Sequence, residues 1–432
     1  MRTIRGLLLA AATFAGSSGA AHAASALVEA VTAHLYAGET AAAAAAAEAR
    51  LAEAPGDDEA RFALGAVQFI QAIESLGQAI HRYGIAGGGP QRSGIARMLP
   101  FFRIPVPANP APEKIDYDAL RAVLETLARD LARAEETLAG IGSVDLDLPL
   151  DIGRVRLDLN GDRSGDNEEA LWSILQQVAR LPQRQDDAAD RLLTDFDGSD
   201  VPWLQGYCHL LMAISEFLLA HDWEAAFEAT FHGVFPSAEL PMSRADAEGK
   251  PLAGEYGVLA DLIAFVHLNH WPVAEPNRMR RVLAHLEAVP PLSRENWRRV
   301  LAETDRRNEW LPNPKQTSVL GAPVTQEVID GWLLFLDELE ALLSGRKLLP
   351  HWRFDQGVNV RRIFEEPTTF DIVLLIQGSA AIPYLEDGEP TSSETWRGIV
   401  TLFRGNSSAT QSGSTDHANE KGPGGGGALP CP

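Results

Sequence analysis

The chain has 432 residues, 45% of them hydrophobic, and a formal charge of -22 at pH 7. A surface this acidic repels nucleic acid and anionic membranes, so neither is expected as a partner, whereas divalent cations are attracted. The charge would equally serve only to keep an exported protein soluble. The two cysteines, Cys208 in an apolar helical stretch and Cys431 in the tail, exclude a disulfide scaffold.

The first 23 residues have the pattern of a secretory signal peptide. Arg2 and Arg5 precede an apolar run at 7–15, and small residues stand at Ala21 and Ala23, where cleavage is expected. The apolar run is shorter than the ~20 residues that a membrane-spanning helix needs. We therefore expect a mature protein that is periplasmic or secreted and does not insert into the membrane after cleavage.

Residues 24–83 are rich in alanine and have helical spacing. Small or turn-forming residues at Gly38, Ala43 and Pro55 are followed by a second set of packing residues. That second set is Ala60, Leu64, Gly65 and Phe69. The pattern resembles one tetratricopeptide repeat and the start of another. The resemblance implies a helical surface for packing or for a protein partner, although a plain helical hairpin fits the same residues.

Three further segments precede the most informative stretch of the chain. Residues 84–116 are rich in glycine and proline and are expected to be either a linker or an ordered cover over the core. The leucine spacing at 117–139 predicts an amphipathic helix that ends before Gly140. Alternating apolar residues at 144–159 then predict strand, with a turn or bulge at Gly153.

Oxygen-bearing residues stand at positions 1, 3, 5, 7, 9 and 12 of a twelve-residue loop that begins at Asp158. They are Asp158, Asn160, Asp162, Ser164, Asp166 and Glu169. Calcium takes six to eight oxygen ligands, and this spacing resembles the calcium loop of EF-hand and dockerin proteins. The resemblance implies a backbone carbonyl ligand from Ser164 and both oxygens of Glu169. The alternative is an acidic turn whose side chains bind their own backbone.

The loop departs from that family at three points. Arg163 stands at position 6, where the family has glycine, and costs about 1 kcal/mol if its φ is positive. Gly165 replaces the aliphatic residue that pairs with a second hand, and the entering segment is predicted as strand. We therefore expect one solitary structural site of strand–loop–helix form, with an affinity of about 10⁻⁴–10⁻³ M.

A second acidic stretch, 195–200, begins the same spacing but lacks an acid at position 12. It is predicted to be a turn and helix start, with a metal site as the alternative. The apolar pattern from 200 to 405 then predicts a helical domain. Its expected helices are 201–220, 222–233, 256–269, 276–288, 293–309 and 325–345. Within 351–404 short strands and buried helix both remain open, and the tail at 406–432 is predicted to be disordered.

Histidines and glutamates at helical spacing provide the candidate catalytic site. His209 and Glu216 share one helix face, and Glu228 and His232 lie on the next helix. Facing helices with Glu and His can build di-metal sites, but those sites use Glu-x-x-His, and the zinc motif His-Glu-x-x-His is missing. Ordinary histidines are the favoured interpretation, so catalytic residues stay unknown and enzymatic activity uncertain.

The expected fold is mainly α. It comprises a multi-helix array with a tetratricopeptide-like N-terminal hairpin, a minor β segment beside the calcium loop, and the predicted units 1–23, 24–83, 84–116, 117–199, 200–405 and 406–432. The expected function is that of an exported calcium-binding module for binding or scaffolding in the bacterial envelope. The alternative is a periplasmic hydrolase or metalloenzyme with its site in the 200–235 helices.

Overall fold

The computed structural model covers most of the chain. It describes residues 26–85, 100–178, 192–241, 255–304, 308–319, 324–392 and 396. The predicted signal peptide at 1–23, the predicted tail at 406–432 and Cys431 lie outside these residues. Cys208 is a buried free thiol whose pKa burial raises to about 12.

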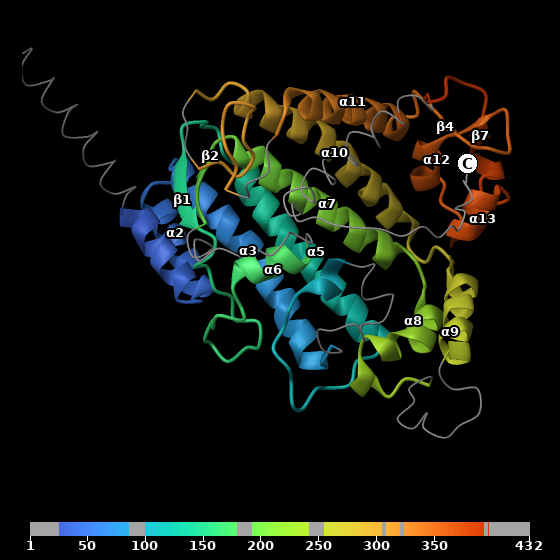
Figure 1. Cartoon of the computed structure of the whole chain (residues 1–432), viewed down its shortest axis with the longest axis horizontal. Coiled ribbons are helices and arrows are strands. Elements are labelled where there is room, and N and C mark those ends of the chain that lie inside the picture. Colours follow the sequence, from blue (N-terminus) through green and yellow to red (C-terminus); the bar gives the residue numbers. More distant parts are fainter. Residues whose placement is uncertain are drawn as a thin grey trace, which may run out of the picture.

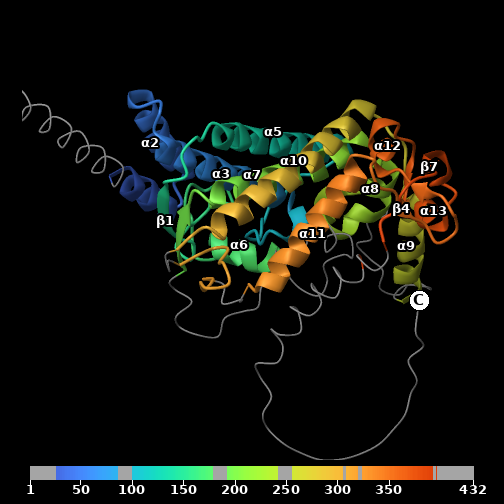
Figure 2. The same cartoon turned by 90° about the horizontal axis from the view of Figure 1, so that it is seen from above.

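The fold is mainly helical with small antiparallel sheets, as predicted. Long helices pack side by side across the molecule, between the paired strands β1 (Asp147–Asp151) and β2 (Leu193–Asp197) at one end and the small C-terminal strands at the other (Figure 1). In order of packing they are α2 (Thr40–Glu53), α3 (Asp58–Tyr83), α5 (Tyr117–Ala139), α7 (Asp200–Ala220), α10 (Pro276–Val300) and α11 (Gln326–Leu343). Figure 2 shows the same array from above. In the described part of the chain, no helix has the length and apolar character that crossing a membrane requires.

Local sequence explains where these helices begin and which face they bury. Asp57 and Asp116 accept hydrogen bonds from the backbone N–H groups of Ala60 (3.0 Å) and Ala119 (2.8 Å), so each caps the helix that follows it. Along α5 the leucines that recur at intervals of three, four and seven all face the core. These buried residues are Leu120, Leu124, Leu127, Leu131 and Leu138. The predicted bounds of this helix match the structure.

The helix α10 differs from its prediction. Two helices were expected, at 276–288 and 293–309, because Pro290 and Pro291 interrupt the sequence pattern. The structure instead has one continuous helix that ends at Val300. Packing along α7 extends past the prolines, and Asn296 Nδ2 donates to the Ser199 carbonyl at 2.9 Å. These contacts hold the backbone in helical form where proline removes its own hydrogen bonds.

The N-terminal helices are joined by tight turns. A helix at 26–36 meets α2 at Gly38, whose φ is 76°, and α3 then runs without a break to Tyr83. Of the glycine- and proline-rich segment, the described part includes Phe101 and Phe102, which are buried in the main core. That part is therefore a cover over the core and not a linker.

The β segment is shorter than predicted. Strand β1 (Asp147–Asp151) pairs antiparallel with β2 (Leu193–Asp197), and Leu150 stands opposite Thr194. The chain then turns, and only a single bridge, Arg156 to Ala170, follows. The prediction of a turn for the start of 195–200 was wrong, because pairing with β1 draws Asp195 to Asp197 into a strand.

In the C-terminal part the structure has a short strand, as one alternative expected, followed by a helix none of whose residues is buried, so the alternative of a buried helix was wrong. Phe370–Asp371 is strand β6, paired with β3 (His270–Trp271), and Ile372–Gln377 continues as helix α13. The remaining elements are α6 (Leu171–Val178), α8 (Glu224–Thr230), α9 (Glu255–Leu268), β4 (Leu349–Pro350), β5 (Gly357–Val358), α12 (Val360–Glu365), β7 (Leu385–Glu386), and 3-10 helices at Pro100–Arg103, Phe231–Gly233, Pro236–Ala238 and Ile382–Tyr384.

Gly38→Ala is expected to destabilise the protein by about 1–3 kcal/mol. The residue has positive φ, and an added Cβ would lie 2.8 Å from the backbone nitrogen of Gly165 in the acidic loop. Gly56→Ala is the control, because an added Cβ there meets nothing within 4 Å. Urea unfolding of both variants tests this, and equal stabilities would contradict it.

Candidate functional site

The twelve-residue loop from Asp158 to Glu169 is closed at its base by backbone hydrogen bonds. Leu157 N donates to the Glu169 carbonyl at 3.1 Å, and Leu171 N donates to the Val155 carbonyl at 3.0 Å. The entering and leaving chains therefore lie side by side, and α6 begins directly after the loop. The loop and the helix after it are present as predicted, but the predicted strand before the loop is only the single bridge between Arg156 and Ala170.

The middle of the loop turns at Arg163, whose φ is 70°. This is position 6, where a left-handed backbone favours glycine. The Asp158 carboxylate accepts hydrogen bonds from Arg163 N at 2.9 Å and from Gly161 N at 2.7 Å. Asp162 likewise accepts from Ser164 N at 2.8 Å. The loop thus curls around the carboxylate at position 1.

Glu169, at position 12, is fully buried. Its Oε1 accepts from Leu159 N at 2.9 Å and from Asn160 N at 3.1 Å, and its Oε2 accepts from Asp166 N at 3.2 Å. Burial raises the pKa of this carboxyl, and the negative charge of Asp166 adds to the effect. The side chain joins both halves of the loop.

A second buried acid, which the sequence did not single out, supports the loop from α3. Glu74 accepts from Asp158 N at 2.7 Å and from Thr40 Oγ1 at 2.5 Å, and burial raises its pKa. One helical turn later, Gln78 Nε2 donates to the Asp158 carbonyl at 2.8 Å. Glu74 and Gln78 are four residues apart and therefore share one helix face. That spacing alone could not predict that both side chains contact the backbone of Asp158.

The predicted ligands match a hard cation in donor type and spacing, but their carboxylates are not drawn together. In the described part of the chain, three carboxylate oxygens converge within 4.8 Å only at Asp197, Glu303 and Glu309. The loop side chains bind mainly their own backbone, as the acidic-turn alternative expects. Bound calcium would be held by Asp158, Asn160, Asp162, Ser164, Asp166 and Glu169.

The acidic group beside β2 involves one residue of the stretch 195–200. Asp197 lies close to Glu303 and Glu309. The buried Asp200 accepts a hydrogen bond from Asp197 N at 3.0 Å through its Oδ2. Burial raises the pKa of Asp200 well above its usual range, and the three neighbouring carboxylates raise it further. Sequence spacing could not find Glu303 and Glu309, which lie more than 100 residues further along the chain.

The predicted histidine and glutamate candidates have separate partners. His209 Nε2 lies 3.5 Å from Glu135 Oε1, and His209 Nδ1 lies 3.0 Å from His285 Nδ1. Glu216 forms ion pairs with Arg278 at 3.1 Å and with Arg281 at 3.0 Å. None of the interactions found among the described residues links these groups to Glu228 or His232.

Glu135 and His285 are the partners that sequence reasoning missed. The hydrogen bond from His209 lowers the pKa of Glu135, whereas burial and the neighbouring His209 lower the pKa of His285. These residues come from α5, α7 and α10, so they form a polar contact across three packed helices. They form no three-ligand metal group in the described part of the chain.

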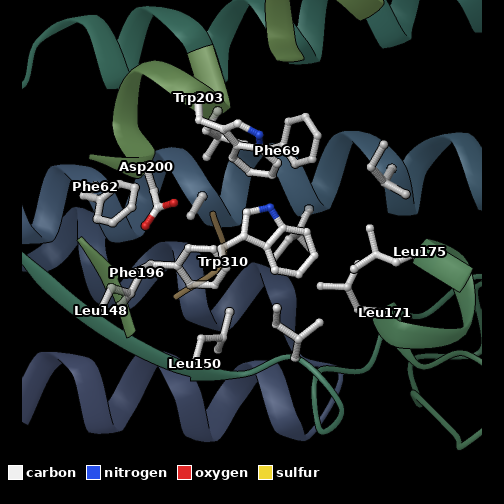
Figure 3. Close-up of a pocket in the computed structure, with 15 residues that line it drawn as sticks. Phe62, Phe69, Leu148, Leu150, Leu171, Leu175, Phe196, Asp200, Trp203 and Trp310 are labelled. Carbon is white, nitrogen blue, oxygen red and sulfur yellow. The ribbon is translucent and has the colours of Figure 1, made fainter. Parts of the chain in front are cut away.

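An apolar cavity of about 110 Å³ lies between α3, the paired strands β1 and β2, α6 and the start of α7 (Figure 3). Aromatic side chains of Phe62, Phe196, Trp203 and Trp310 form much of its wall, and the carboxyl group of Asp200 is part of it. This cavity had no signal in the sequence, because its wall combines residues from 62 to 310.

In comparisons with known proteins, no family model, curated protein or solved structure matches the chain. Its function is therefore inferred from its own residues.

Asp200→Asn is expected to remove a pH-dependent loss of stability. With a raised folded-state pKa, the carboxyl contributes full stability below the unfolded value of about 3.9, and this contribution is lost as pH rises toward the folded value. Through this one group, the free energy of unfolding changes by at most about 1.4 kcal/mol per pH unit. Urea unfolding between pH 4 and 8 measures it.

In that series the difference in stability between Asp200→Asn and wild type should grow with pH in favour of the variant. The exposed Asp118→Asn serves as the control and should follow wild type throughout. A difference for Asp200→Asn that stays constant with pH would contradict the raised pKa.

Proposed function

We propose that the protein is an exported calcium-binding module of the bacterial envelope, in which the loop 158–169 holds a structural ion. The observation that carries the proposal is the combination of ligand spacing with a left-handed turn at position 6. Arg163 adopts this turn although its side chain disfavours it. Positive φ also occurs in ordinary turns, but a calcium loop of this type requires a sharp turn at position 6 in particular.

Electrostatics supports the same proposal. Glu169 is buried close to Asp158 and Asp166, and burial of Glu74 adds another carboxyl beneath the loop. Buried carboxylates are costly unless a cation or hydrogen-bond donors compensate them. A divalent ion would offset half of the charge of the four ionised acids of the ligand set and connect the loop entry to α6.

The module would present its N-terminal helices to a protein partner in the periplasm or outside the cell. α2 packs on α3, and its buried residues include Ala43 and Ala47. The helix at 26–36 contributes Leu27, Val31 and Leu35 to the same core. Their remaining faces lie at the end of the helical array (Figure 1). A binding or scaffolding role follows from this position and from the resemblance to a tetratricopeptide repeat.

The second candidate is a hydrolase or metalloenzyme built on the α7 histidine. The contact of His209 with Glu135 and His285 is the observation in its favour. Against it, Glu216 is already paired with two arginines, and Glu228 and His232 are not joined to it among the interactions of described residues. The calcium module therefore accounts for more of the molecule.

Calcium is expected to raise the melting temperature of the wild-type protein by a few degrees relative to chelator. An ion present at 100 times its Kd stabilises the folded state by about 2.7 kcal/mol. The double variant Asp158→Asn/Asp162→Asn should lose this difference, because two charged ligands become amides. Differential scanning calorimetry with and without calcium measures both proteins.

Glu168→Gln is the matched control. Glu168 is an exposed acid of the same loop, but it stands at position 11, outside the ligand set. This variant should retain the wild-type response to calcium. If wild type melts at one temperature in calcium and in chelator, the structural-metal proposal fails.

Arg163→Gly is expected to stabilise the loop with and without calcium, by about 1 kcal/mol, because glycine adopts positive φ without strain. It should also tighten calcium binding, which isothermal titration calorimetry measures. Arg163→Lys retains the charge and the side-chain strain, so it should behave like wild type. A similar gain in Arg163→Lys would attribute the effect to the guanidinium and not to the backbone.

A further inference from the structure

The apolar cavity beside α3 has a volume of about 110 Å³ and is partly open, so it is a pocket and not a sealed void. Its wall is built from α3, β1, β2, α6, α7 and Trp310, so it rests on regular elements that pack on one another. A small molecule could therefore enter it without unfolding the core.

The chemistry of the wall disfavours water as the occupant. Of the described residues that line the cavity, Asp200 alone has an ionisable side chain, and the others are alanine, aliphatic or aromatic. A buried water needs two to four polar partners, and dry apolar cavities bind small apolar molecules instead. The wall therefore suits a compact hydrophobic ligand.

The aromatic side chains favour a flat ring. The rings of Trp203 and Trp310 are 5.8 Å apart at 66°, and those of Phe196 and Trp310 are 6.2 Å apart at 40°. Several ring faces and edges thus surround the same space (Figure 3). A void of about 150 Å³ accepts benzene, so this smaller cavity matches one ring with slight adjustment of the side chains.

Asp200 adds one polar contact to this apolar wall. Asp200 is only 3% exposed. Among the described residues, the one hydrogen bond to its side chain comes from Asp197 N, which donates to Oδ2. Asp200 is part of the wall, although the accessible surface of the cavity is almost entirely apolar, and its carboxyl retains capacity for a further hydrogen bond. Burial raises the pKa of this carboxyl, which favours its uncharged form and suits an uncharged partner.

We propose that the cavity binds a small neutral molecule with one aromatic ring and one hydroxyl group, of the phenol class. The ring would lie among Trp203, Trp310 and Phe196, and the hydroxyl would hydrogen-bond to Asp200. This site goes beyond the proposed calcium module and does not require the ion.

Isothermal titration calorimetry of the purified protein with phenol and with toluene tests the site. Both probes should bind wild type at millimolar concentrations or below. Ala66→Leu places a larger side chain in the cavity and should weaken both probes at least tenfold. Leu175→Phe fills the space from α6, on another wall, and should do the same. Ala46→Leu is the matched control, a half-buried alanine of α2 outside the cavity, and should bind like wild type.

Asp200→Leu separates the polar contact from the apolar one. It retains the approximate volume of the side chain but removes both oxygens, so phenol should bind roughly fivefold more weakly. Toluene should bind as before, which also shows that the cavity is intact. Failure of both probes to bind wild type, or wild-type binding by both Ala66→Leu and Leu175→Phe, would overturn the proposal. Equal weakening of phenol and toluene in Asp200→Leu would overturn the role of Asp200.

Discussion

The packing of the loop 158–169 against α3 is the constraint on which both the loop and the neighbouring cavity depend. Glu74, Gly77 and Gln78 lie on one face of that helix and meet the chain at Asp158 and Leu159. A Cβ at Gly77 would overlap Leu159 Cδ2, so the fully buried leucine would have to shift if any other residue stood there. On either side, Glu74 and Gln78 bind the backbone of Asp158. The loop entry is thereby fixed to the helix that also forms part of the cavity wall.

This arrangement concentrates negative charge inside the protein. Glu74 and Glu169 are buried next to Asp158, and Asp200 is buried next to Asp197, all within a chain of net charge -22. Backbone N–H groups satisfy the loop carboxylates, whereas arginines satisfy acids elsewhere, as Arg278 and Arg281 do for Glu216. Within the loop 158–169 the only basic residue is Arg163, and Arg156, just before the loop, donates to Asn167 and to backbone carbonyls. This uncompensated charge is what the proposed calcium ion would offset.

Local patterns predicted the structure where local forces decide it. The leucines of α5 gave its bounds, and the spacing from Asp158 to Glu169 identified a loop that closes on itself. Long-range contacts were invisible: Glu74 lies 84 residues before Asp158, and His285 lies 76 residues after His209. The same limit explains the errors. Pro290 and Pro291 end a helix by local rules, but packing against α7 continues it.

The helix α6 links the two candidate sites physically. Glu169 and Leu171 are two residues apart; the first closes the loop, and the second belongs to the cavity wall, as does Leu175 one turn later. The hydrogen bond from Leu171 N to the Val155 carbonyl makes the start of this helix part of the loop base. Whatever orders the loop therefore also fixes one wall of the cavity. Two ligands that each favour the same ordered α6 would strengthen one another by an equal factor, because such coupling is reciprocal.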